Sequence, residues 1–266
     1  MKRVLKQALL RRIFSWCDAL LICGSAGEAY LKRYGVPECK IVRSPYEPNY
    51  DLIQNIAYDQ VEKVRRKFGL VDGRRRLVYC GRLSREKRVD VLLRAFSRIV
   101  HERPLWDLLL IGDGPLRNEL PSLIPGLDSD RVVWTGFQAD AETIAALYKS
   151  CDVLVIPSDH EPWGLVVNEA VAAGLAVVAS DVVGAARDLV QDGLNGMFFR
   201  PGDEDALVHA LVRVTSDNTV DRLKIGSATV LKRWRKISDP VNGLRDAMRL
   251  IGALSSLDEK KGNDDQ

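Results

Sequence analysis

Two glutamates near the start of an expected helix form the most informative segment of the sequence. Glu161 and Glu169 are separated by seven residues, with the first in a loop and the second on the helix. A loop carboxylate can accept hydrogen bonds from a sugar hydroxyl, and one on a helix can hold a ribose diol. The helix start at Gly164, Leu165 and Val166 offers free backbone N–H groups to an anion. Read alone, the glutamates fit equally well as a helix cap and a solvent-facing side chain.

A basic loop follows the first apolar run of the main body. Gly81 permits a tight turn after Cys80, and Arg82 and Lys87 follow before the next expected helix. Arginine forks and helix N-termini both favour phosphate oxygens. Basic loops are often simply solvated, so the loop gains meaning only beside the two glutamates. Together they predict a site with cationic and hydroxyl-binding groups.

A glycine-rich turn follows the second apolar run. Gly112 and Gly114 flank Asp113 and precede Pro115. We expect the glycines to let a ligand approach the backbone closely, although an ordinary turn with proline at a helix start explains them too. Asp113 is not part of an Asp-x-Asp motif, so a bound divalent metal is not indicated.

Apolar strands alternate with helices from Leu77 onward, which predicts a parallel sheet covered on both faces. Right-handed crossovers give a doubly wound, Rossmann-like α/β fold whose ligands bind at the carboxyl ends of the strands. The expected strands are 77–80, 108–111, 132–134, 153–156, 176–179 and 197–199. The expected helices are 59–68, 89–102, 116–123, 141–150, 164–173, 185–189, 203–215, 220–235 and 240–251.

The first 58 residues differ from this regular body. Strands at 19–23 and 40–43 flank a helix that ends near Tyr34, a fragment too small for a domain of its own. A basic amphipathic helix precedes them, and it suits either an anionic membrane surface or packing against a domain outside this chain. We favour the second interpretation. The expected divisions are 1–58 as the remnant of an N-terminal domain and linker, 59–235 as the ligand-binding domain, 236–254 as a closing helix and 255–266 as a disordered tail.

Composition narrows the class of protein. The 266 residues are 46% hydrophobic and 28% charged, which is ordinary for a globular chain, and the net charge of +3 is too small to indicate nucleic acid. Five cysteines without a Cys-x-x-Cys pair and three scattered histidines argue against zinc or a disulfide framework and suit a reducing cytoplasm. We expect Cys80 and Cys151 in the core, and most of the basic residues between 63 and 88 on a solvated face. No apolar run is long enough to span a membrane.

The motifs, in their order and spacing from Leu77 to Leu211, resemble glycosyltransferase family 4, which has the two-domain GT-B fold and belongs to the group 1 type. The resemblance implies that Arg82 and Lys87 bind the donor diphosphate, that Glu161 contacts the donor sugar, and that Glu169 binds the ribose. The motifs are Gly81-Arg82-Leu83 with Glu86-Lys87, Gly112-Asp113-Gly114-Pro115, Trp134 with Gly136-Phe137, Glu161-Pro162-Trp163-Gly164-Leu165 with Glu169, 174–180, and Asp192-Gly193 with Asn195-Gly196.

The resemblance also implies which residues surround the donor. Loops after Ile111 and around Phe137 would line the base and ribose, and His160 is among the expected substrate-binding residues. Together, Arg82, Lys87 and Glu161 are the expected catalytic residues. The expected substrate-binding residues are Gly81, Gly112, Gly114, Phe137, His160, Gly164, Leu165, Val166 and Glu169.

The implied activity is metal-independent hexosyl transfer from a nucleoside-diphosphate sugar, with retention and without a cofactor, in glycan or polysaccharide biosynthesis. The implied partners are the sugar donor and a glycan or lipid-linked acceptor in the cytoplasm, with peripheral contact at the inner face of the membrane left open. The alternatives are a non-catalytic nucleotide-sugar-binding module and, less favoured, an epimerase or hydrolase of the same architecture.

Two departures from the family stand out. Arg88 follows the motif lysine, where many members have glycine, and only the end of the first Rossmann-like domain is recognisable before Pro48. We therefore expect a chain truncated at its N-terminus, as a fragment or as a natural half that pairs with another chain or with itself.

Overall fold

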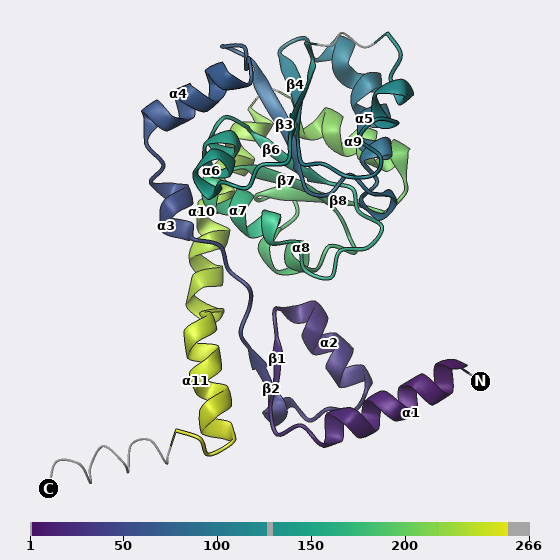
Figure 1. Ribbon diagram of the computed structural model, residues 1–266, viewed down its shortest axis with the longest axis vertical. Helices are drawn as coiled ribbons and strands as arrows, with labels where there is room; N and C mark the ends of the chain where they lie inside the picture. The colour runs from purple at the N-terminus through teal and green to yellow at the C-terminus, as the bar shows by residue number, and fades with distance from the viewer. Residues whose placement is uncertain (1, 127–129, 217, 255–266) are drawn as a thin grey trace, which may run out of the picture. The chain divides into compact units, whose positions relative to one another are not determined.

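The structure, a computed structural model, describes residues 2–126, 130–216 and 218–254. They belong to two compact units, one of Pro48–Arg233 and one that combines Met1–Glu47 with Trp234–Gln266 (Figure 1). Residues 48–58, expected with the N-terminal segment, belong to the larger unit. The expected disordered tail at 255–266 lies outside the described residues.

The larger unit is built on a six-stranded parallel sheet, so the predicted fold class is confirmed. The strands are β3 (Arg75–Cys80), β4 (Trp106–Ile111), β5 (Val132–Gly136), β6 (Val153–Ile156), β7 (Ala176–Ser180) and β8 (Gly196–Phe199). Their order is β5-β4-β3-β6-β7-β8, and each adjacent pair is parallel. The chain adds strands outward from β3 on one side and from β6 on the other. This reversal is the switch point at which doubly wound sheets bind ligands.

Helices cover both faces of this sheet (Figure 1). They are α3 (Tyr50–Gln54), α4 (Tyr58–Lys67), α5 (Val89–Ile99), α6 (Ala141–Lys149), α7 (Leu165–Ala173), α8 (Gly184–Leu189), α9 (Glu204–Val214) and α10 (Thr219–Ile237), whose last residues belong to the smaller unit. Helices α5 and α9 pack together on one face, and α4, α6 and α7 lie on the other. Helix α5 buries Val89, Leu92 and Phe96 completely, because their helical spacing places them on one side.

The helix expected at 116–123 is not formed as predicted. The chain instead makes turns that lead into a short 3₁₀ helix, η4 (Leu120–Leu123). The Leu116 N–H donates to the Leu83 carbonyl at 3.0 Å, which ties the start of this segment to the loop after β3. Pro121 has no N–H to continue an α-helical ladder. Two further 3₁₀ helices flank α5: η2 (Arg85–Lys87) and η3 (Val100–Glu102).

The smaller unit contains the β-α-β fragment that the sequence predicts. Strands β1 (Leu20–Ile22) and β2 (Ile41–Arg43) are parallel, and α2 (Ser25–Arg33) and the 3₁₀ helix η1 (Glu38–Lys40) connect them. Helix α11 (Pro240–Leu250) packs on β2, where Gly243 lies so close to the Arg43 carbonyl that a side chain would clash.

Helix α1 (Lys2–Ser15) begins the smaller unit. Its apolar residues Leu5 and Leu9 and the neighbouring Trp16 are exposed, Trp16 by 71%. Within the described residues, no helix combines the length and apolar character that a membrane span requires.

Candidate functional site

A cavity of about 500 Å³ opens at the carboxyl ends of β3 and β4, entirely within the larger unit. Its walls come from the loops after β3, β4 and β5 and from helices α6 and α7. The lining residues are Cys80, Gly81, Arg82, Ile111, Gly112, Asp113, Phe137, Gln138, Ile144, Val166 and Glu169. The structure thus brings six of the sequence-predicted site residues together: Gly81, Arg82, Gly112, Phe137, Val166 and Glu169.

Arg82 is the exposed cation at this cavity. Among the described residues, no carboxylate lies within ion-pair distance of its guanidinium. Its backbone is fixed, because the Tyr79 hydroxyl donates to the Arg82 carbonyl at 2.8 Å. Burial raises the pKa of Tyr79 well above its usual range, so this phenol stays protonated as a donor. The loop therefore presents an exposed positive charge to the cavity.

Lys87 and Glu161 form an ion pair beside the cavity. The Lys87 Nζ lies 2.5 Å from the Glu161 Oε2, and both side chains are largely covered, with exposures of 20% and 16%. Lysine has three N–H donors, so Lys87 can keep this bond and still bind an oxygen of a ligand. The two residues, predicted separately from the sequence, act as one unit.

Glu169 lies in the cavity wall, and a buried tyrosine holds it. The Tyr148 hydroxyl donates to the Glu169 Oε2 at 3.0 Å. Burial raises the pKa of Glu169 above its usual range, and the hydrogen bond from Tyr148 opposes that rise. A carboxylate that is short of solvent gains from new donors, such as the hydroxyl groups of a ribose.

The loop before α7 is fixed at both ends. Gly164 precedes the first helical residue and has a φ of 89°. A side chain on Gly164 would crowd Glu161. The first turn of α7 leaves the N–H groups of Leu165 and Val166 without helical acceptors. The Gly184 N–H donates to the Glu161 carbonyl at 3.0 Å, which anchors the loop to the start of α8. Val166 lines the cavity, so this helix start faces the site.

The two glycines after β4 allow two loops of the protein to pack closely, a role that the sequence did not predict. A Cβ atom on Gly112 would lie 1.9 Å from the Gly81 carbonyl oxygen, and one on Gly114 would lie 2.5 Å from that of Leu83. The glycines therefore let the loops after β3 and β4 pack against each other. Gly112 still lines the cavity, whereas Gly114 does not.

Other predicted residues lie around the cavity without lining it. His160 is exposed beside the paired Lys87 and Glu161, and Gly164 is half-buried behind them. Leu165 instead lines a smaller hollow of about 150 Å³ that shares Glu169 with the main cavity.

The structure also adds residues that the sequence did not single out. They are Cys80, Asp113, Gln138 and Ile144 in the cavity wall, and Tyr148 behind Glu169. Cys80, expected in the core, instead lines the cavity, whereas Cys151 is buried as expected. The position of Cys80 at a strand end was the available signal, but Tyr148 looks like any core residue of a helix.

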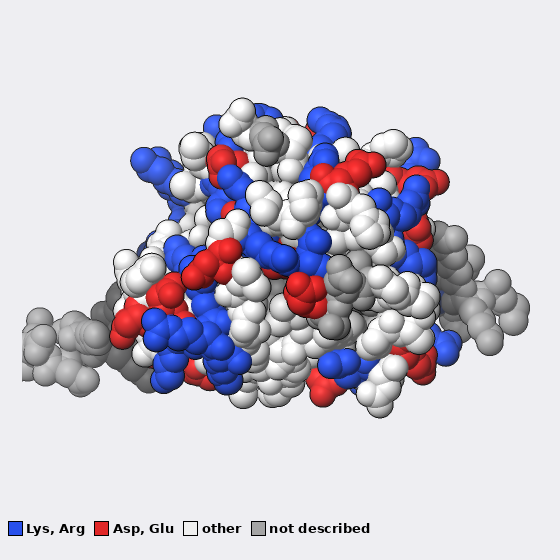
Figure 2. Space-filling model, turned by 90° about the horizontal axis from the view of Figure 1, so that it is seen from above, with Lys and Arg blue, Asp and Glu red and all other residues white. Residues whose placement is uncertain are grey.

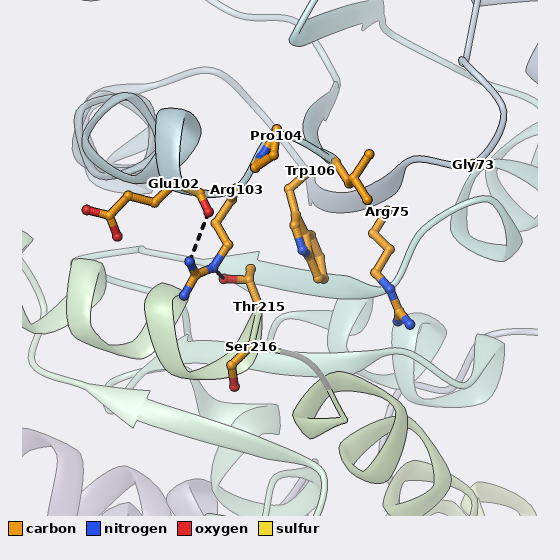
Figure 3. Close-up of a pocket in the computed structure, with 9 residues that line it drawn as sticks. Gly73, Arg75, Glu102, Arg103, Pro104, Trp106, Thr215 and Ser216 are labelled. Carbon is orange, nitrogen blue, oxygen red and sulfur yellow. Dashed lines mark hydrogen bonds between the residues drawn. The ribbon is translucent and has the colours of Figure 1, made fainter.

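A second hollow, of about 370 Å³, lies at the amino ends of β3 and β4 (Figure 3). Its arginines are already bound to the protein. Arg103 donates to the Thr215 Oγ1 and to the Glu102 carbonyl, each at 3.0 Å, and to the Val212 carbonyl at the end of α9. Arg75 makes two bonds of 2.8 Å to Asp221. Arg103 therefore binds groups at the end of α9, and Arg75 binds Asp221 from the amino end of β3. Both arginines already have partners within the protein.

The same finding corrects the expectation of a solvated basic face between residues 63 and 88. Arg76 is only 2% exposed and donates to the carbonyls of Ser150 and Val71. Arg74 pairs with the buried Asp107 at 2.9 Å. Several of these cations therefore belong to the architecture of the sheet. Among the described residues, no group of three or more His, Cys, Asp or Glu side chains is arranged to hold a metal ion.

Comparison with known proteins identifies the family. A family model described as "Glycosyl transferases group 1" matches residues 74–217, more than half of the chain. The chain belongs to the group 1 glycosyl transferases. It is 33% identical over 245 residues to an uncharacterized glycosyltransferase of Methanocaldococcus jannaschii, covering 89% of this chain and 62% of that protein.

Other relatives carry more specific names. A GDP-mannose-dependent alpha-(1-6)-phosphatidylinositol dimannoside mannosyltransferase of Mycobacterium tuberculosis is 34% identical over 140 residues, covering 53% of this chain and 35% of that protein. A crystal structure of Anabaena HepE in complex with UDP and glucose superposes with a TM-score of 0.73 at 22% identity, covering 96% of this chain and 69% of that chain. This likeness shows the shared fold. The chain spans less than two thirds of the curated relatives' lengths.

Proposed function

We propose that this chain binds a nucleoside-diphosphate sugar in the cavity at the sheet switch point and acts in hexosyl transfer for glycan or polysaccharide biosynthesis. The observation that carries the proposal is the convergence of the exposed Arg82 and the half-buried Glu169 on one cavity. One supplies positive charge for a diphosphate, and the other supplies hydrogen-bond acceptors for a ribose. Membership of the group 1 glycosyl transferases supports the same assignment.

The proposed role of the basic loop is to stabilise the leaving diphosphate. Negative charge builds on that group as the bond from the anomeric carbon breaks, so donors placed there lower the barrier. Arg82, Lys87 and the N–H groups at the start of α7 are the proposed donors. Their positive charge supports a reaction that needs neither a metal ion nor a cofactor.

The two glutamates have separate proposed roles. Glu169 accepts hydrogen bonds from the ribose, and the exposed ring of Phe137 offers a surface for the base. Glu161, held by Lys87, contacts the transferred sugar together with His160. Because Lys87 and Glu161 are paired, the contact with the phosphate and the contact with the sugar would form in a fixed relative position.

The proposed chemistry is substitution with retention. The bond between the anomeric carbon and the diphosphate oxygen breaks, and a bond to the acceptor hydroxyl oxygen forms on the same face. The acceptor proton passes to an oxygen of the leaving diphosphate. An open cavity permits hydrolysis when water replaces the acceptor.

The acceptor is proposed as a glycan or a lipid-linked glycan, taken up in the cytoplasm. The exposed apolar residues of α1 and its lysines and arginines suit an anionic membrane surface or a partner chain. A non-catalytic nucleotide-sugar-binding role is the alternative, because every residue lining the cavity lies in one unit.

Calorimetry with UDP, GDP and ADP, each with and without EDTA, tests the proposed binding site. We expect micromolar to millimolar binding of at least one nucleotide that EDTA leaves unchanged. Loss of binding in EDTA would overturn the metal-free mechanism, and absence of binding to all three would overturn the site. An assay of sugar transfer and donor hydrolysis with the same nucleotides as sugar donors then separates an enzyme from a binding module.

A further inference from the structure

The turn that follows Lys87 holds an arginine in a left-handed backbone conformation. Arg88 has φ 53° and ψ 37°, and among the described non-glycine residues only Asn218 shares a positive φ. This conformation crowds the Cβ atom of an L-residue and is tolerated best by glycine and asparagine. An arginine in this conformation carries a backbone cost, which contacts of its side chain can offset.

The Arg88 side chain bridges two loops of the larger unit. Its Nη1 donates to the Asp159 Oδ2 at 2.9 Å, and its Nε donates to the Asp90 Oδ1 at 3.2 Å. Gly202 lies over the guanidinium, where a Cβ atom would be 3.3 Å from Nη1. The arginine is thus held from several sides, although Asp159 itself remains partly exposed.

The residues of the bridge are close neighbours in sequence of the proposed catalytic pair. Asp159 precedes Glu161 by two residues, and Arg88 follows Lys87. The Asp159 N–H also donates to the Glu86 carbonyl at 2.8 Å. The segments that carry Lys87 and Glu161 are therefore joined by two further bonds besides the contact between these two side chains.

We propose that Arg88 is a positioning residue that fixes the Glu161 loop against the Lys87 turn, so that the sugar and diphosphate contacts form together. The proposal rests on the proposed function. It predicts that the Arg88 guanidinium matters for the sugar-bearing donor more than for the free nucleoside diphosphate, because Arg82 and Glu169 lie outside the bridge. It also predicts that the left-handed backbone at position 88 costs less free energy when glycine replaces the arginine.

Two variants separate these effects. Arg88→Gly removes both the guanidinium and the backbone cost, and Arg88→Asn removes the guanidinium with a side chain that tolerates the left-handed conformation. We expect both variants to bind the best of UDP-glucose, UDP-N-acetylglucosamine and GDP-mannose about tenfold more weakly than the wild type, because a Glu161 carboxylate that is no longer held in place loses its hydrogen bond to the sugar. We expect the matching nucleoside diphosphate to bind within about twofold of the wild type, and the melting temperature of Arg88→Gly to be no lower. A merely structural arginine would lower the melting temperature.

Asp159→Asn removes the carboxylate that binds Arg88 and should reproduce the tenfold loss of donor affinity. The double variant Arg88→Gly/Asp159→Asn should show no further loss, because both substitutions break the same bond. Arg98→Ala is the matched control, because Arg98 binds Glu204 and Asp205 and neither of the two carboxylates that bind Arg88. It should leave the ratio of donor to nucleotide affinity unchanged. If the wild type binds nucleotides and Arg88→Gly keeps the wild-type ratio, the positioning role is refuted while the proposed function stands. If the wild type binds none of the nucleotides or donors, the proposed function fails and the positioning role fails with it.

Discussion

The two ends of β3 carry arginines in opposite situations. At its amino end, Arg74 pairs with Asp107, Arg75 with Asp221, and Arg76 is buried with carbonyl partners. At its carboxyl end, Arg82 has no carboxylate within ion-pair distance among the described residues. The amino end is denser in basic residues, yet its charges are already compensated. A cation that its own protein leaves uncompensated is the better sign of an anionic ligand.

The surface seen from above carries charges of both signs. Figure 2 looks from above, the side from which α4 leads into β3 in Figure 1, and blue side chains are interspersed with red ones there. Such pairs contribute little where they are exposed, but a carboxylate buried between two cations is costly to remove. Substitutions at the amino end should therefore change stability, and those at the carboxyl end should change binding.

The largest effect is expected at Asp107, which is buried and accepts bonds from Arg74 at 2.9 Å and Arg131 at 3.1 Å. Asp107→Asn removes the buried counter-charge of Arg131 and leaves Arg74 only the exposed Asp130 at 3.8 Å, so it should lower the free energy of unfolding by ~3 kcal/mol. Urea denaturation measures the loss. Nucleotide affinity, measured by calorimetry well below the melting temperature, should be unchanged. A large loss of affinity in the folded variant would show that the two ends of the sheet are not independent.

The next largest effect is expected at Arg82. Arg82→Ala should weaken nucleoside diphosphate binding by ~1.5–3 kcal/mol, the range for hydrogen bonds to a charged group. Its free energy of unfolding should stay within ~0.5 kcal/mol of the wild type, because the side chain is exposed. Arg75→Ala is the control, since it removes an equal charge at the other end of β3. Equal losses of affinity in both variants would mean that general positive charge, not a site, attracts the nucleotide.

Much of the fold was predictable, because the buried strands read as continuous apolar runs. Strand β4 is buried along its entire length, and the alternation of such runs with helices predicts the parallel sheet. The order of the chain then places the loops after β3 and β4 side by side, so Arg82 and Gly112 were found by position alone. The wrong prediction at 116–123 has a tertiary cause, because the Leu116 N–H donates to the Leu83 carbonyl, which is distant in sequence.

The contacts between side chains could not be predicted from the sequence. Nothing in the spacing of Lys87 and Glu161 says that they meet at 2.5 Å, because their contact depends on how two loops approach across the switch point. Tyr148 was missed for another reason. A buried aromatic residue in a helix is usually part of the core, and the sequence does not show that the Tyr148 hydroxyl donates to Glu169. The sequence thus predicted which loops form the candidate site but not how their residues are coupled.

A smaller effect is expected at Tyr148, and it should depend on pH. Burial raises the pKa of Glu169, so its carboxylate, the proposed ribose acceptor, is lost at a higher pH than an exposed glutamate would be. Tyr148→Phe removes a bond that stabilises the carboxylate and should raise this pKa further. We expect ~1 kcal/mol weaker nucleotide binding and an acidic limb of the binding curve displaced to higher pH. Calorimetry across the acidic range measures both.

Glu169→Gln is the control for this pH dependence, because its side chain does not titrate. Its nucleotide affinity should be weak and lack the acidic limb. The pKa of Glu169 is raised in the folded chain, so ionisation costs stability as pH rises from the ordinary glutamate range through the raised pKa. The unliganded Glu169→Gln variant should therefore be more stable than the wild type above that window. An identical acidic limb in the wild type, Tyr148→Phe and Glu169→Gln would assign the titration to another group.

The smallest effect is expected at His160, which is exposed and does not line the cavity. Its proposed partner is the transferred sugar, because it lies next to Glu161 in the loop that Lys87 holds. His160→Ala should leave the affinity for a free nucleoside diphosphate unchanged and weaken the matching sugar donor by ~0.5–1 kcal/mol, the net value of one hydrogen bond at a solvated site. Paired calorimetric titrations of the variant with both ligands measure this difference. A loss that is equal for the two ligands would place His160 against the diphosphate, and would extend the anion-binding end of the sheet from the loop after β3 to the loop after β6.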